Sequence, residues 1–297
     1  SCIFKKRNAQ SYFAIQTFAA PIVQTQGTAQ GFHFDNSNMK PIVNNEGWKK
    51  AFELYKATGK YGPPDELNMD IGDTRALFKA GRCGLIVEWG DPGTLQLDDD
   101  AKSIRGKMYA ISAVGSTEVL DRATGKLVPV SSATAPYAVD GINYAPFAAF
   151  GGWAGAVNKG ADAKTKAAAY AFLSYMNQAA QSGIDVTIGA TGYNPYRTSQ
   201  LASTDLWVKA GMPKALADNY LGAINGAINN LNMASDMKIP GAQKYTSVVL
   251  DTELARYLAG EISVDEALAN IEEGWEEVTE DFGRDEQVAS QALALGL

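Results

Sequence analysis

Helix-like and strand-like patterns alternate along the middle of the chain, and this alternation constrains the fold more than any other feature of the sequence. The helical patterns cover 45–58, 74–79 and 162–177, and the strand-like apolar runs cover 84–87, 107–114 and 154–158. In the first helical pattern Trp48, Phe52 and Tyr55 recur at steps of three and four residues. Asp73 and Asp162 stand where the other two helices need a capping side chain. Such alternation predicts an α/β fold.

The last third of the chain is predicted to be mostly helical. Pro213 suits the first turn of a helix over 215–228, and a further helix is expected over 243–260. Ser263 and Glu266 form a capping box that opens another helix. One face of that helix carries an apolar stripe: Leu268, Ile271, Trp275, Val278 and Phe282. We expect this stripe to be buried.

A β-hairpin is predicted upstream of the 154–158 run. The apolar pairs 119–120 and 127–128 flank a polar segment with Gly125 at its turn. We expect this hairpin to be an exposed excursion from the fold.

The composition is that of a folded, acidic chain. Its 297 residues are 46% hydrophobic, and 26 basic against 33 acidic side chains give a net charge of −7. This length predicts about two domains. A nucleic acid needs a concentrated basic patch, and the sequence contains none, so no nucleic-acid partner is expected. The uncharged run 141–158 is interrupted by Asn143, Pro146 and four glycines, so no membrane insertion is expected.

The cysteines and the single histidine do not suggest a metal site. Cys2, Cys83 and His33 are too few for a Cys/His zinc site, and the wide cysteine spacing matches no redox pair. The apolar surroundings of Cys83 favour a buried free thiol, and a Cys2–Cys83 disulfide is the alternative. His33 and the Trp275 stripe are assigned to the core. The chain starts at Ser1 without a leader-like apolar segment, so any targeting segment is expected outside this sequence or already removed.

The motifs of several enzyme classes are missing from the sequence. There is no G-x-S-x-G, and His33 is the only imidazole available as a base for a nucleophile. Neither a phosphate-binding loop nor a G-x-G-x-x-G follows a strand, so no cofactor is expected. The acidic pairs at 65–66 and 98–100 could serve glycoside hydrolysis, but adjacent acids are more often solvated surface charges.

Three loops combine aromatic, glycine and hydrogen-bonding residues. They are Trp89-Gly90-Asp91, Phe150-Gly151-Gly152-Trp153 and Tyr193-Asn194-Pro195-Tyr196-Arg197. A sugar ring has apolar faces that stack on indole or phenol rings, and a rim of hydroxyls that carboxylate, amide and guanidinium groups bind. Glycine lets the backbone approach such a ligand closely. These loops therefore predict a carbohydrate site, although a lone tryptophan or a Gly-Gly pair is also common in ordinary packing and turns.

Four segments of the chain form a characteristic series of motifs. The strongest is Tyr144 to Asn158, YAPFAAFGGWAGAVN, followed by the 162–177 helix. The others are Phe78 to Leu85, FKAGRCGL, then Ala190 to Arg197, and Gly260 to Leu268. In this order they resemble the sugar-binding extracellular solute-binding proteins of bacterial ABC importers, with an "F-x-x-G-x-x-A-M" element that leads into a ligand loop, a Pro-Arg segment and a "G-x-x-s-x-x-e-A-L" element. The similarity runs from about Gly47 to the end.

This resemblance implies an α/β type II periplasmic-binding fold, with two lobes joined by a hinge. It assigns 1–105 to the second lobe, 106–178 to the first, and 179–297 to the rest of the second lobe with its bracing helices. It also implies that the first lobe is incomplete, because such proteins usually carry a further N-terminal segment of about a hundred residues, much of a domain.

The resulting hypothesis is a periplasmic or extracellular, non-enzymatic protein that binds a carbohydrate and delivers it to an ABC permease. Closure of the hinge on the ligand is expected to shift its conformational equilibrium. The candidate ligand residues are Trp89, Gly90, Asp91, Gly151, Gly152, Trp153, Tyr193, Asn194, Arg197 and Tyr245. The alternatives are an interaction or receptor module that keeps the fold without transport, and a carbohydrate-active enzyme.

Overall fold

The computed structural model describes residues 1–112, 114–150, 152–189 and 191–297. Its α-helices are α1 (Ser11–Val23), α2 (Glu46–Ala57), α3 (Ile71–Lys79), α4 (Ala163–Met176), α5 (Ala179–Asp185), α6 (Thr198–Leu201), α7 (Asp205–Lys209), α8 (Lys214–Ile228), α9 (Asp251–Ala259), α10 (Val264–Phe282) and α11 (Arg284–Leu295). Shorter helical turns are η1 (Thr58–Tyr61), η2 (Glu66–Asn68), η3 (Asp91–Leu97) and the π-helical η4 (Lys244–Leu250). The strands are β1 (Gly115–Ser116), β2 (Glu118–Asp121), β3 (Lys126–Pro129), β4 (Asn143–Tyr144), β5 (Phe147–Ala148) and β6 (Ala234–Ser235).

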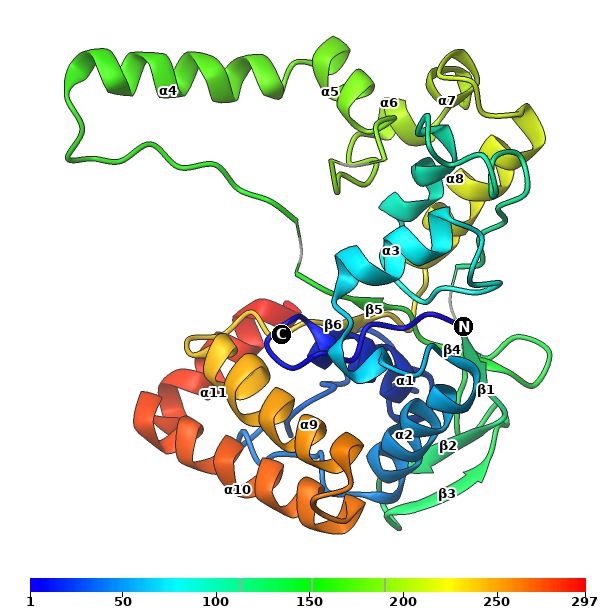
Figure 1. The fold of residues 1–297 in the computed structure, drawn as a ribbon. Helices are drawn as coiled ribbons and strands as arrows, with labels where there is room; N and C mark the ends of the chain where they lie inside the picture. The colour runs from blue at the N-terminus through cyan, green and yellow to red at the C-terminus, as the bar shows by residue number, and fades with distance from the viewer. Residues whose placement is uncertain (113, 151, 190) are drawn as a thin grey trace.

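The largest core lies among α1, α2, α9 and α10, in the lower part of Figure 1. Asn45 caps α2 by accepting hydrogen bonds from the backbone N–H groups of Gly47 and Trp48. The capped helix directs Trp48 against Trp275 of α10, with ring centroids 6.4 Å apart. Both indoles are fully buried. The predicted first helix is therefore confirmed.

The capping box and apolar stripe of α10 are also confirmed. The Ser263 hydroxyl accepts from the Glu266 N–H, while the Glu266 carboxylate accepts from the Ser263 N–H. Four residues of the stripe, Leu268, Ile271, Trp275 and Val278, are buried, whereas Phe282 at its end is partly exposed. The helix over 243–260 begins instead as η4 and continues as α9, ending at Gly260 in the left-handed conformation that favours glycine.

The strands are short and form three two-stranded sheets. β1 pairs with β4 and β2 with β3 in antiparallel fashion, whereas β5 and β6 run parallel. The predicted hairpin is β2–β3, but the expectation that it is exposed is wrong. Val119 and Leu120 are buried, because β2 packs against α1 and β3 against α2.

Three strand predictions are wrong in the described residues. At 84–87 the chain forms only one bridge, between Ile86 and Cys2. The described parts of 107–114 and 154–158 carry no strand. Apolar runs of this length become strands only when a neighbouring edge supplies hydrogen bonds. The cap of α3 also differs from the prediction, because Asp70 is the N-cap and Asp73 completes a capping box with it.

A second core joins α7 and α8 in the upper part of Figure 1. Trp207 of α7 packs edge-on against Tyr220 of α8, with ring centroids 6.1 Å apart. Val186, Leu216 and Leu221 complete this cluster. The residues of 179–297 therefore belong to two separate cores, and the predicted division into lobes stays a prediction.

Cys2 and Cys83 form a disulfide, so the expectation of a buried free thiol is wrong. Their Cα atoms are 5.8 Å apart although 81 positions separate them in sequence. The Cys2 N–H also donates to the Leu85 carbonyl. The pairing ties the N-terminus to the segment that precedes Trp89.

α4 projects from the rest of the chain at the end of a long extended segment (Figure 1). Asp162 caps it as predicted, by accepting from the Thr165 N–H. The helix is half-buried or exposed along its whole length, including Tyr170, Phe172 and Tyr175. Among the described residues, no helix is long and apolar enough to cross a bilayer.

Candidate functional site

Trp89 stands in a cluster of aromatic rings drawn from four separate segments. Its ring is nearly parallel to Phe4, with centroids 5.7 Å apart, and edge-on to Phe13 of α1 at 5.5 Å. Phe150 stacks on it with centroids 5.9 Å apart and planes inclined by 26°. The disulfide and the Cys2–Ile86 bridge position the chain just before this indole.

Phe150 connects Trp89 to Trp153. The Phe150 and Trp153 rings are stacked with centroids 6.1 Å apart, and the Trp153 ring is 77% exposed. Phe150 has a φ of 65°, a left-handed conformation that is uncommon for a residue with a side chain, and its N–H donates to Asp236 at 2.9 Å. Gly152 also has a positive φ, and Gly151 lies outside the described residues. The two predicted tryptophans thus share one aromatic row through a phenylalanine that the site prediction did not include.

A buried cluster of charges lies beside Trp89. Arg75 of α3 binds the Glu88 carboxylate through Nε and Nη2, and its Nη2 is 2.8 Å from Asp91 Oδ2. The side chains of Glu88 and Asp91 are 1% and 5% exposed. Burial raises the pKa of Glu88 to about 7 against the opposing effect of Arg75, and burial also raises the pKa of Asp91. Two carboxylates therefore share one guanidinium.

Asn194 meets this loop at Gly90. A Cβ atom at position 90 would lie 2.8 Å from Asn194 Oδ1, so a larger residue there would displace that amide. At Gly93 a Cβ would likewise overlap the Tyr220 ring of α8. Glycines at both positions bring an amide and a phenol against the loop that carries Asp91.

Several polar atoms around this loop have no hydrogen-bond partner in the described part of the chain. They are Trp89 Nε1, Asp91 Oδ2, Asn194 Oδ1 and the Tyr220 hydroxyl. Of these, Asp91 Oδ2 is the exception, because it is ion-paired with Arg75 Nη2 at 2.8 Å. Buried polar atoms are normally satisfied, so a group of unsatisfied ones marks a place where a ligand or water would bind.

Three of the predicted ligand residues lie elsewhere. Arg197 donates to the Ser182 hydroxyl and to the Asn177 carbonyl, and its guanidinium stacks on Tyr196. Tyr193 packs against the second core. Tyr245 is fully buried in the first core, where its hydroxyl is 2.9 Å from that of Thr279. We therefore leave Tyr245 out of the candidate site.

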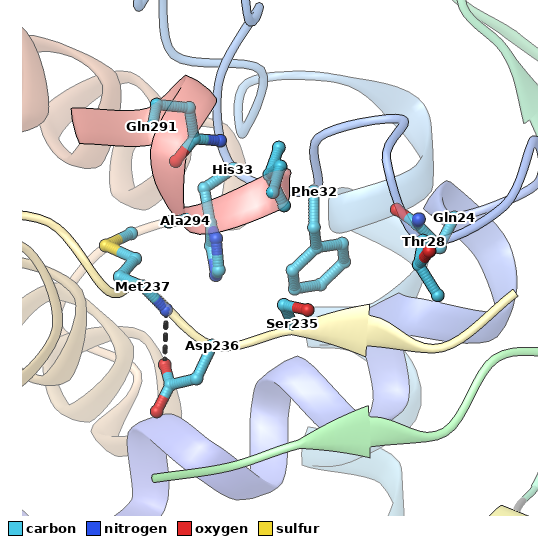
Figure 2. Close-up of a pocket in the computed structure, with 10 residues that line it drawn as sticks. Gln24, Thr28, Phe32, His33, Ser235, Asp236, Met237, Gln291 and Ala294 are labelled. Carbon is cyan, nitrogen blue, oxygen red and sulfur yellow. Dashed lines mark hydrogen bonds between the residues drawn. The ribbon is translucent and has the colours of Figure 1, made fainter. Parts of the chain in front are cut away.

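A small cavity lies behind the aromatic row. Its walls include Phe32, His33, Ser235, Asp236 and Met237 (Figure 2). Its volume of about 10 Å³ holds at most one water and excludes a sugar. Asp236 connects the two regions, because its carboxylate accepts from the N–H groups of both Phe150 and Met237.

Three of the five acids considered for hydrolysis are held in ion pairs. Glu66 is buried against Lys5 and accepts from the Ile3 N–H. Lys79 pairs with both Asp98 and Asp100. Within the described ranges, no group of three or more His, Cys, Asp or Glu residues is placed to hold a metal ion.

Solved structures identify the architecture. A solute-binding protein of an ABC transporter from Agrobacterium vitis S4, with bound D-mannitol, matches 95% of this chain and 61% of its own, with 18% identity and a TM-score of 0.58. Maltose-bound MalE3 of T. maritima matches 93% of this chain and 59% of its own, with 15% identity and a TM-score of 0.62. An ABC transporter solute-binding protein from Agrobacterium radiobacter K84, in complex with ribitol, also matches 93% of this chain and 59% of its own, with 18% identity and a TM-score of 0.61. The chain has the ABC solute-binding fold. The predicted fold class is confirmed.

The solute-binding fold found here spans only part of its solved neighbours. The chain covers 59% to 61% of the length of those three proteins. No protein-family model and no curated protein matches the sequence.

Two residues of this solute-binding fold were missed by the sequence analysis. Phe150 belongs to one of the three loops named in the sequence analysis, so it could have been included among the candidate ligand residues. Tyr220 lies 129 positions after Asp91 in an ordinary helical pattern, so no local signal marked it.

Proposed function

We propose that this chain is the ligand-binding part of a carbohydrate- or polyol-binding protein that serves an ABC permease. The observation that carries the proposal is the row Trp89, Phe150 and Trp153, together with the Asp91 carboxylate and the unsatisfied Asn194 amide oxygen at the same loop. Aromatic faces next to hydrogen-bonding groups suit a ring or chain of carbons that bears hydroxyls. The bound ligands of the solved neighbours, D-mannitol, maltose and ribitol, have this chemistry.

The proposed mechanism is binding without chemical change. The ligand stacks on the aromatic row while Asp91 and Asn194 accept hydrogen bonds from its hydroxyls. Phe150 and Gly152 have a positive φ, and the Phe150–Trp153 loop that carries part of the row lies within the segment assigned to the first lobe. If that segment closes on the ligand, the closed, ligand-bound conformation is the one that the permease would bind.

The proposed location is periplasmic or extracellular. A disulfide that joins the N-terminus to the ligand loop persists only where thiols are oxidised. The ABC solute-binding fold agrees with this location.

A second candidate function is an interaction module of the same fold. It is favoured by α4, whose Tyr170, Phe172 and Tyr175 side chains are each more than half exposed. Under this alternative, a partner protein covers that apolar surface, and sugars do not change the stability of the chain.

A thermal-shift screen with D-mannitol, ribitol and maltose tests the proposal and separates it from the alternative. A ligand at a hundred times its Kd adds about 2.7 kcal/mol to the free energy of unfolding, which raises Tm measurably. The expected result is a concentration-dependent rise with at least one neutral sugar or polyol. If a broad panel of sugars and polyols leaves Tm unchanged, the proposed function is wrong.

A further inference from the structure

One guanidinium holds the chain on both sides of Trp89. Arg75 of α3 binds the Glu88 carboxylate just before the indole, and its Nη2 lies 2.8 Å from Asp91 Oδ2 just after it. We propose that Arg75 is a positioning residue, which fixes the turn that carries Trp89 and acts on the ligand only through that indole. The inference rests on the proposed function and concerns how the aromatic row is kept in its binding conformation.

The geometry of this charged cluster suits an arginine and no other cation. Nε of Arg75 donates to both oxygens of Glu88, at 2.7 and 3.0 Å, while Nη2 is shared between Glu88 and Asp91. A guanidinium presents its donors in one fixed plane, whereas a lysine ammonium is a single point of charge on a flexible stem. The two carboxylates are therefore held at a set separation, which fixes the path of the chain from 88 to 91.

Burial makes these contacts strong. The Glu88 and Asp91 side chains are almost fully buried, and the Arg75 side chain is only 19% exposed. Charges shielded from water attract each other more strongly than exposed ones, and a buried carboxylate that loses its cation is left uncompensated. Movement of the turn away from α3 would break two such contacts at once.

The helix that carries Arg75 is itself well anchored. A capping box opens α3, and Phe78 near its end packs in a third core together with the Cys2–Cys83 disulfide. The chain from 83 to 91 is thus held at one end by the disulfide and at the other by Arg75, and Trp89 lies between the two anchors. An indole held in this way stacks on Phe150 before any ligand arrives, so binding does not have to order it.

The cluster also makes the position of Trp89 sensitive to pH. Among the described residues, the charged groups that face Glu88 are Arg75 of α3 and Asp91 of η3, and α8 contributes the phenol of Tyr220 at Gly93. Burial raises the pKa of Glu88 to about 7 against the opposing effect of Arg75. A proton on Glu88 removes its charge and weakens its bonds to Arg75. Ligand affinity should therefore fall as the pH drops through about 7.

Arg75→Lys tests the positioning role, with Lys79→Ala as the matched control. Lys79 lies one turn later on α3 and also pairs with two carboxylates, Asp98 and Asp100, but these do not flank Trp89. The probe is whichever sugar or polyol of the thermal-shift screen raises Tm most, and calorimetry measures its affinity. Arg75→Lys should weaken it about tenfold, because the turn must then be ordered on binding, while Lys79→Ala should leave it unchanged. Natural affinity in Arg75→Lys, or an equal loss in Lys79→Ala, overturns the inference.

A double-mutant cycle separates positioning from general destabilisation. In a Trp89→Ala background, Arg75→Lys should cause little further loss of affinity, because the side chain that it positions is gone. If the losses from Arg75→Lys and Trp89→Ala add independently, the inference is overturned.

Glu88→Gln supplies the pH readout and leaves Arg75 a charged partner in Asp91. This variant imitates protonated Glu88, so at every pH it should show the several-fold weaker affinity that the natural sequence reaches in acid. The same pH profile in both proteins overturns the inference and leaves the proposed function intact. The proposed function itself fails only if no sugar or polyol binds the natural sequence.

Discussion

The indole of Trp89 illustrates how one residue joins the parts of this site. It touches the N-terminal segment through Phe4, α1 through Phe13 and the 150–153 loop through Phe150. Its Nε1 has no acceptor in the described residues. Trp89 thus joins three segments of the chain and keeps one buried polar atom without a partner among the described residues.

Trp89→Ala should weaken sugar binding by about 1–3 kcal/mol, because a large contact surface is lost. Calorimetry with the ligand selected by the screen measures this. Trp275→Phe, in the first core, should reduce stability and leave affinity unchanged. Unchanged affinity of Trp89→Ala would remove Trp89 from the site.

Because His33 is buried, we expect the free energy of unfolding to fall in acid. Burial lowers the pKa of His33 to about 3, well below the 6.5 of an exposed histidine. The unfolded chain therefore binds the proton first, and the folded state loses stability as the pH falls from about 6.5 towards 3. At pH 5 this amounts to about 2 kcal/mol relative to neutral pH. In urea titrations, His33→Gln should lack this part of the acid dependence; an identical pH profile would contradict the assignment.

At the scale of elements, α4 and α10 have similar local sequence signals, but the apolar face of one is exposed and that of the other is buried. α4 and α10 both begin at a capping side chain and both carry apolar side chains at helical spacing. α10 buries its stripe against α2 and α9, whereas α4 leaves its own exposed. Helix formation follows local rules, but burial of a helix face depends on a partner surface.

Removing the two caps should therefore have different consequences. Ser263→Ala should lower the free energy of unfolding by about 1 kcal/mol, because α10 belongs to the core. Asp162→Ala should fray α4 with little effect on the global transition, because no core depends on that helix. Tryptophan fluorescence in urea reports the first effect and amide hydrogen exchange the second. Equal losses of global stability would show that α4 is part of the cooperative fold.

At the scale of the whole molecule, long-range links position the site. The disulfide connects residues 81 positions apart, and buried Asn143 and Asn232 bond to each other and to the Gln24 carbonyl at the end of α1. These links bring the N-terminal segment, the segment before Trp89 and the segment before β6 into one framework.

Cys2→Ser with Cys83→Ser should lower the free energy of unfolding by about 4.5 kcal/mol, the chain-entropy value for a loop of this length. Ligand affinity should also fall, because the segment before Trp89 loses its anchor. Urea unfolding and calorimetry measure the two effects, with the reduced and oxidised forms of the natural sequence as a second comparison. Unaltered stability in the double variant would contradict the structural role of the disulfide.

The sequence by itself determined the features that depend on neighbouring residues. The helices around Trp48 and Trp275, the β2–β3 hairpin and the capping of α4 were predictable because caps, turns and helical spacing act over a few residues. The aromatic and polar character of the Trp89 loop was visible for the same reason. Only the tertiary structure decided that Cys2 pairs with Cys83, that the Tyr220 ring packs at Gly93 and that 84–87 forms a single bridge. Those outcomes depend on which distant surfaces meet, and no local pattern encodes that.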